Sequence, residues 1–144
     1  MTISSYGLSL ILAIIACVIG GVLGGLTLAR PGSVLGLTPR EGEQPLTGLS
    51  TEGRALGGLL ILSHAATALF LGYQSSVGAA MAFALAMAWL GAALGRAVSA
   101  LIDRARARLN LGNLAFEILI AATLSLPFFN AGRLVVLRGH GMLV

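Results

Sequence analysis

The chain has 144 residues, of which 57 % are hydrophobic and only 10 % are charged, and its mean hydropathy is +0.95. Soluble domains carry about 25 % charged residues, so this composition excludes a soluble globular enzyme, a disordered tail and a disulfide scaffold. The formal net charge of +4 comes with nine basic residues, all arginine, which lie at the ends of apolar segments instead of gathering in one groove. We therefore expect a small polytopic membrane protein of one domain that has no nucleic-acid partner. Cys17, the single cysteine, excludes an internal disulfide.

The first apolar segment, residues 8–28, contains 21 residues without a charge. That length crosses a hydrocarbon core of about 30 Å at about 1.5 Å per residue. The segment before it has no basic side chain, and the apolar stretch is longer than that of a signal peptide. It is therefore predicted to be a transmembrane helix that is retained in the mature protein and ends at Arg30-Pro31-Gly32.

A polar loop is predicted from there to Gly53, because this segment holds three of the four prolines and three glutamates. Residues 55–73 and 77–95 are predicted as the second and third spans. Only the uncharged turn of residues 74–76 separates them. Two spans joined by so short a link must be antiparallel neighbours, so we expect a helical hairpin.

The segment that follows the third span, Arg96 to Leu109, places apolar residues on one helical stripe and most of its charges off that stripe. Two structures fit this pattern equally: a helix lying in the membrane interface, and an extension of the third span. The fourth span is predicted within residues 114–137. Pro127 is a candidate kink, and residues 130–133 are expected to end or interrupt the helix.

The fold class expected is all-α, a single domain forming an integral membrane bundle of four transmembrane helices. With four spans, the loops at residues 29–54 and 96–112 lie on one side and carry seven arginines, against Arg133 and Arg138 on the other. The positive-inside rule then places both loops in the cytoplasm and both termini in the periplasm of a bacterial inner membrane.

Glycines spaced at i and i+4 let two helix backbones approach closely. The first and third spans contain such pairs among Gly20, Gly21, Gly24, Gly25, Gly91 and Gly95. We favour packing inside the protein's own bundle over a contact between two copies.

Glu117 is the only acidic residue placed inside a predicted span. A charge at the bilayer centre costs about 2.5–3.5 kcal/mol even on the insertion scale, but Glu117 lies only about 6 Å into the fourth helix. Arg96 and Arg54 lie at helix ends on the same side of the membrane. We expect Glu117 to form an ion pair with one of them that clamps helix ends together; the alternative is a proton or headgroup site.

His64 lies about 15 Å past Arg54 along the second span, near mid-membrane. A lone histidine there more often bonds a carbonyl or hydroxyl group of a neighbouring helix than a metal or haem. The chain also lacks a cysteine pair, a mid-bilayer carboxylate pair, a nucleophile elbow and a phosphate-binding glycine loop. We therefore expect a protein that is not an enzyme and has no metal and no cofactor.

Three short stretches carry a family resemblance: Glu52 to Gly58, Gly95 to Ser99 followed by Asp103, and Phe116 to Ile118. They resemble a widespread set of bacterial four-helix inner-membrane proteins catalogued as a domain of unknown function. The resemblance covers about residues 8 to 137. It implies four helices and a polar cluster at one membrane face, and it brings no established activity or cofactor.

Two functions of different classes remain open. The first is a non-catalytic accessory or structural subunit that packs against a larger membrane complex, for example a respiratory or photosynthetic one. The second is a small carrier or sensor of a lipid, quinone or proton, built around Arg54, Arg96, Glu117 and His64. The partners expected are membrane lipids together with other membrane-protein subunits or a second copy of the chain.

Overall fold

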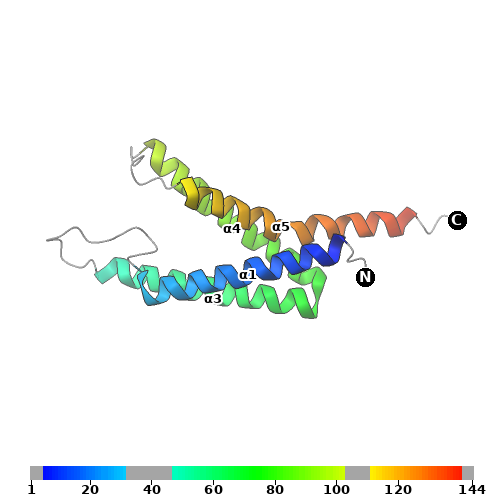
Figure 1. Cartoon of the computed structure of the whole chain (residues 1–144), viewed down its shortest axis with the longest axis horizontal. Coiled ribbons are helices and arrows are strands. Elements are labelled where there is room, and N and C mark those ends of the chain that lie inside the picture. The colour runs from blue at the N-terminus through cyan, green and yellow to red at the C-terminus, as the bar shows by residue number, and fades with distance from the viewer. Residues whose placement is uncertain (1–4, 32–46, 103–110, 141–144) are drawn as a thin grey trace. The chain divides into compact units, whose positions relative to one another are not determined.

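The computed structural model describes residues 5–31, 47–102 and 111–140, with side chains in 5–31, 51–102 and 111–131. Within those ranges the chain forms four α-helices and no strand (Figure 1). The helices are α1 (Ser5–Ala29), α3 (Thr47–Tyr73), α4 (Ser75–Ile102) and α5 (Leu111–His140).

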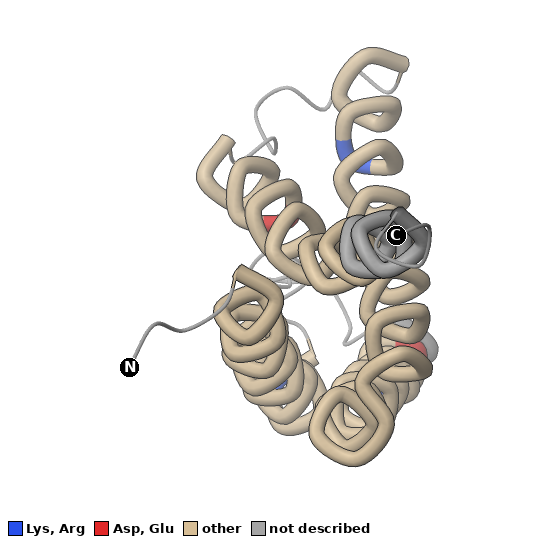
Figure 2. The backbone as a smooth tube through the Cα atoms, turned by 90° about the vertical axis from the view of Figure 1, so that its right-hand side faces the viewer, with Lys and Arg blue, Asp and Glu red and all other residues tan. Residues whose placement is uncertain are grey.

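All four helices are long and apolar enough to cross a membrane. The qualifying stretches are Ser5–Ala29, Thr51–Tyr73, Ser75–Ile102 and Leu111–Ala131. Charged residues are few along the described helices (Figure 2). Lipid offers the backbone no hydrogen bonds, so a long apolar segment satisfies its own N–H and C=O groups by forming a helix. The predicted all-helical membrane fold with four spans is confirmed.

The chain forms two compact units, which are described separately. The first unit, residues 17–66, contains the later part of α1 and the earlier part of α3. The second unit, residues 1–16 with 67–144, contains the start of α1, the end of α3, and all of α4 and α5.

Glycines bring the two helix backbones of the first unit into direct contact. A Cβ placed on Gly24 would lie 2.9 Å from the carbonyl oxygen of Gly57. A Cβ placed on Gly57 would lie 2.6 Å from the backbone nitrogen of Leu28. Since no side chain fits at either position, α1 and α3 pack backbone against backbone there.

In the second unit, α3 and α4 are joined by a tight turn at Gln74. Its amide donates to the Phe70 carbonyl oxygen at 2.8 Å, and the Gly78 amide donates to the Gln74 carbonyl oxygen at 2.9 Å. A Cβ on Gly78 would overlap the backbone of Leu71, so only glycine allows this close return. The turn is the one predicted between the second and third spans, although α4 begins two residues earlier than expected.

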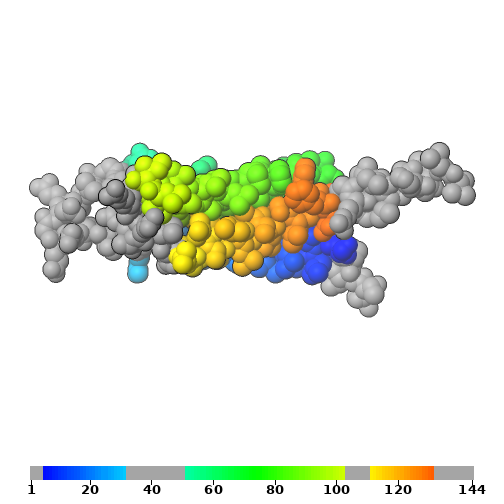
Figure 3. Space-filling model, turned by 90° about the horizontal axis from the view of Figure 1, so that it is seen from above, coloured from blue at the N-terminus to red at the C-terminus, as the bar shows by residue number. Residues whose placement is uncertain are grey.

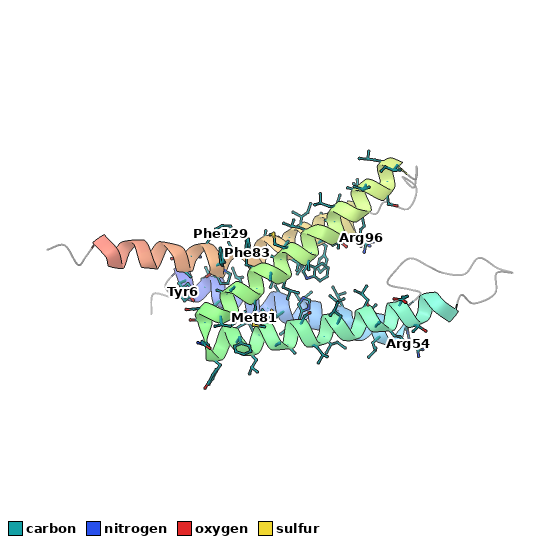
Figure 4. All side chains as sticks on the ribbon, turned by 180° about the vertical axis from the view of Figure 1, so that it is seen from behind. Tyr6, Arg54, Met81, Phe83, Arg96 and Phe129 are labelled. Carbon is teal, nitrogen blue, oxygen red and sulfur yellow. The ribbon has the colours of Figure 1, made fainter. Side chains whose placement is uncertain are left out.

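The helices α4 and α5 lie side by side (Figures 1 and 3). Small residues line the buried side of α4, and larger ones, including Ile120 and Leu124, are buried on α5. Phe83 stacks on Phe128 with ring centroids 4.5 Å apart and also meets the edge of Phe129 (Figure 4). These aromatic contacts join α4 and α5 near Phe83.

The predicted boundaries differ most from the structure at three helix ends. The second span was expected to begin at residue 55, after a polar loop that reached Gly53, but α3 begins at Thr47. The third span was expected to stop at residue 95, but α4 continues to Ile102, as an extension of the span; residues 103–110 lie outside the described range. The prediction that the fourth span ends or breaks at residues 130–133 is wrong, because α5 runs to His140 and contains Pro127 inside it. Asn and Gly cost a helix only about 0.7–1 kcal/mol each, which is too little to break it.

Candidate polar site on the α4–α5 pair

Arg96 lies on α4, six residues before the helix ends at Ile102. It lies about 30 Å along the helix from Ser75, a distance close to the thickness of a hydrocarbon core. Its side chain is 43 % exposed, so the guanidinium group stands at the edge of the helix pair (Figure 4). An arginine at this depth reaches the region of lipid phosphates.

Glu117 faces Arg96 from α5. The Arg96 Nε atom donates a hydrogen bond to Glu117 Oε1 at 2.6 Å, and the Glu117 side chain is only 5 % exposed. The two residues therefore form a charge-assisted bond between neighbouring helices. Of the two arginines considered as partners for Glu117, Arg96 is the one bonded to it. Arg54 is an exposed residue of α3 in the first unit.

The second carboxylate oxygen of Glu117, Oε2, is buried and has no hydrogen-bond partner in the described part of the chain. Two other buried polar side chains there bond to their own helix: Ser9 Oγ donates to the Tyr6 carbonyl oxygen at 2.7 Å, and Thr27 Oγ1 donates to the Leu23 carbonyl oxygen at 2.8 Å. A buried unpaired polar atom costs about 1–3 kcal/mol, and more when it is charged. Oε2 is therefore the atom of this site that can still accept a hydrogen bond from a bound group.

A second contact between α4 and α5 is aromatic. Trp89 of α4 meets Phe116 of α5 edge to face, with ring centroids 6.2 Å apart. Phe116 is the direct neighbour of Glu117 in the chain. The polar site thus combines one partly exposed cation and one buried acceptor, and the aromatic contact adds to the packing of the same two helices.

His64 is fully buried in the first unit. Its Nδ1 lies 2.7 Å from the carbonyl oxygen of Leu60, one turn back on the same helix. A carbonyl oxygen only accepts, so Nδ1 carries the proton in this bond. The imidazole lies against Gly20 of α1, where a Cβ would overlap the ring. Among the described residues, no group of three His, Cys, Asp or Glu side chains could hold a metal ion.

The predicted packing glycines fall into two groups. Gly20 and Gly24 contact α3, as described above. The others, Gly21, Gly25, Gly91 and Gly95, have no heavy atom within 4 Å of where a Cβ would stand. For these four, close helix packing stays a prediction.

Sequence reasoning missed Gly57, which packs as closely as Gly24, and Gly78 at the α3–α4 turn. Gly57 lies four residues after Gly53. This is the same i and i+4 spacing that singled out the first span, but Gly53 was assigned to the predicted loop and not to the second span. Gly78 has no such signal, because its role depends on how sharply the chain turns at Gln74.

A family model described as a domain of unknown function, DUF4345, matches residues 7–127 of the chain. The match covers nearly the range over which the sequence resembled an uncharacterised membrane family, and it confirms that resemblance. No curated protein and no solved structure matches the chain.

Proposed function

The chain belongs to the DUF4345 family of domains of unknown function, and we propose that it acts as a non-catalytic membrane subunit that packs against another membrane protein. Four helices long and apolar enough to span a membrane support the integral placement. The main support for the packing role is the exposed face of α4 that contains Gly91 and Gly95.

Gly91 and Gly95 are both exposed, and a Cβ on either would meet open space. A glycine inside a helix costs about 1 kcal/mol relative to alanine, and these two gain no close contact within the described chain in return. Exposed alanines continue the same face at Ala84 and Ala88. Small residues at this spacing let a partner helix approach closely in lipid, where dispersion contacts drive association.

The test places large side chains on this face. The double variant Gly91→Leu/Gly95→Leu is compared with Gly58→Leu, because Gly58 also faces open space but has no glycine one turn away. We expect the double variant to recover at least about tenfold less partner from native membranes in mild detergent, which corresponds to about 1.4 kcal/mol of association free energy. Mass spectrometry identifies and quantifies the partner. Recovery equal to that of Gly58→Leu would rule out this face as the interface.

We also propose that the protein resides in a bacterial inner membrane with both termini in the periplasm, because the predicted loops on the opposite side carry seven of the nine arginines. A reporter that works only in the cytoplasm, fused after Gly42 or after Val144, measures this orientation. We expect activity at Gly42 and none at Val144. The reverse pattern would show that the orientation is inverted.

A further inference from the structure

We propose that the Arg96–Glu117 pair binds the headgroup of a phospholipid that carries a protonated amine. In this complex the terminal Nη groups of Arg96 donate to the lipid phosphate, and an N–H of the lipid ammonium donates to Glu117 Oε2. The site goes beyond the packing role proposed above. It is also distinct from the Gly91–Gly95 face, since Arg96 lies about 100° around the helix from Gly95.

The need for a donor at Glu117 comes from Oε2. This oxygen accepts no hydrogen bond in the described chain, although it is buried and belongs to a side chain that is only 5 % exposed. A carboxylate oxygen can only accept, so whatever satisfies it must bring an N–H or O–H group. A positively charged donor fits best, because the bond is then charge-assisted.

The capacity for phosphate comes from Arg96. A guanidinium group has five N–H donors in a planar fork. The bond to Glu117 uses Nε, and neither Nη group has a partner in the part of the chain that the structure describes. The ion pair thus fixes the plane of the guanidinium group and leaves its terminal edge for a bidentate bond to phosphate.

The depth and surroundings of Arg96 favour a lipid as the source of that phosphate. Arg96 lies at about the hydrocarbon boundary, where lipid phosphates are found. The span to which it belongs, Ser75–Ile102, is apolar enough to lie in a membrane. A phospholipid of the surrounding bilayer therefore presents its phosphate at the height of Arg96, whereas a water-soluble phosphate would have to leave the aqueous phase to reach it.

The geometry also selects between headgroups. A phosphate brought next to Glu117 would repel the carboxylate unless a cation comes with it. Phosphatidylethanolamine supplies that cation with N–H donors, whereas the quaternary ammonium of phosphatidylcholine has the charge but no N–H group. Discrimination between these two lipids therefore reports on the bond to Oε2.

The experiment uses the full-length protein, purified in mild detergent and freed of lipid, and measures bound lipid by native mass spectrometry. The probes share the same acyl chains: phosphatidylethanolamine, its N-methyl and N,N-dimethyl forms, and phosphatidylcholine. We expect the three lipids with an N–H group to bind the wild-type protein about tenfold more tightly than phosphatidylcholine, the gain of one charge-assisted bond. This series needs no variant, so it does not depend on a variant folding.

Three variants then test which side chain binds the lipid phosphate and which binds the lipid ammonium group. Arg96→Ala is expected to lose at least about tenfold in binding of every lipid in the series, because the phosphate contact is gone. Glu117→Gln is expected to bring phosphatidylethanolamine and phosphatidylcholine to within about twofold of each other, because the amide cannot accept at both positions. Arg54→Ala, which removes an exposed arginine of the first unit, serves as the control and is expected to keep the wild-type preference.

Equal binding of phosphatidylethanolamine and phosphatidylcholine by the wild-type protein would overturn the proposal, and so would an unchanged preference in Glu117→Gln. Free phosphoethanolamine that competes as well as the lipid itself would show that the ligand is a soluble phosphate compound and would overturn the assignment to lipid. Because the Gly91→Leu/Gly95→Leu variant leaves Arg96 and Glu117 in place, it is expected to bind lipid as the wild-type protein does. Failure of the packing role and failure of the lipid site are therefore distinguishable.

Discussion

Replacing Gly57 by alanine is expected to lower the free energy of unfolding by about 3 kcal/mol, at the upper end of the usual cost of overpacking. The added Cβ would lie 2.6 Å from the Leu28 backbone nitrogen and 2.7 Å from the Gly24 carbonyl oxygen. Both obstacles are backbone atoms, which cannot turn aside as the end of a flexible side chain can. The α1 and α3 helices must separate instead, and they then lose dispersion contacts along their length.

The neighbouring glycine provides a matched control. A Cβ on Gly58 meets nothing within 4 Å, so Gly58→Ala is expected to leave stability unchanged or raise it by up to about 1 kcal/mol through helix propensity. Melting in detergent, followed as the loss of the monodisperse peak in gel filtration, is expected to show an apparent Tm about 10 °C lower for Gly57→Ala than for Gly58→Ala. Equal melting of the two variants would mean that α1 and α3 do not pack through Gly57.

Arg96→Ala is expected to destabilise the protein by about 3 kcal/mol, because it leaves the buried carboxylate of Glu117 without a counter-charge. Glu117→Ala is expected to cost less, about 1 kcal/mol. The Arg96 side chain is 43 % exposed, so once released it can turn toward headgroups and water. The asymmetry between the two variants follows from their unequal burial, and simple loss of a surface ion pair would not produce it.

The double variant Arg96→Ala/Glu117→Ala measures the interaction energy between the two side chains, apart from the effect of each side chain alone. Each single change removes the same bond, so we expect the double variant to be more stable than the sum of the two single effects predicts, with a coupling energy of about 1–2 kcal/mol. Melts of the wild-type protein, both single variants and the double variant in one detergent give this value. Additive effects would mean that Arg96 and Glu117 do not interact.

The helices could be predicted from sequence because their physical cause is local. An uncharged run such as residues 8–28 must satisfy its own backbone in lipid, so length and composition suffice. The helix ends were harder to predict. Arg96 reads as a terminus because it is charged, yet α4 continues to Ile102, since an arginine can reach the interface from inside a helix.

The polar site could be predicted only in part. Glu117 stands out because an acid is rare in an apolar segment, and its need for an arginine follows from the cost of a buried charge. The choice between Arg96 and Arg54 depends on which helices are neighbours, and one sequence contains no such information. The unpaired Oε2 atom depends on side-chain geometry that no residue pattern expresses. Gly20 was predicted to pack, but the reason, the imidazole of His64 against it, became visible only in the structure.

The most direct test of the proposed function is the native mass of the wild-type protein extracted from its own membrane in mild detergent. The proposed role as a subunit predicts that the chain is recovered in a fixed ratio with a second membrane protein. Recovery of the chain as a stable monomer would contradict that role. Lipid bound to such a monomer would favour a small lipid carrier or sensor built on the Arg96–Glu117 pair.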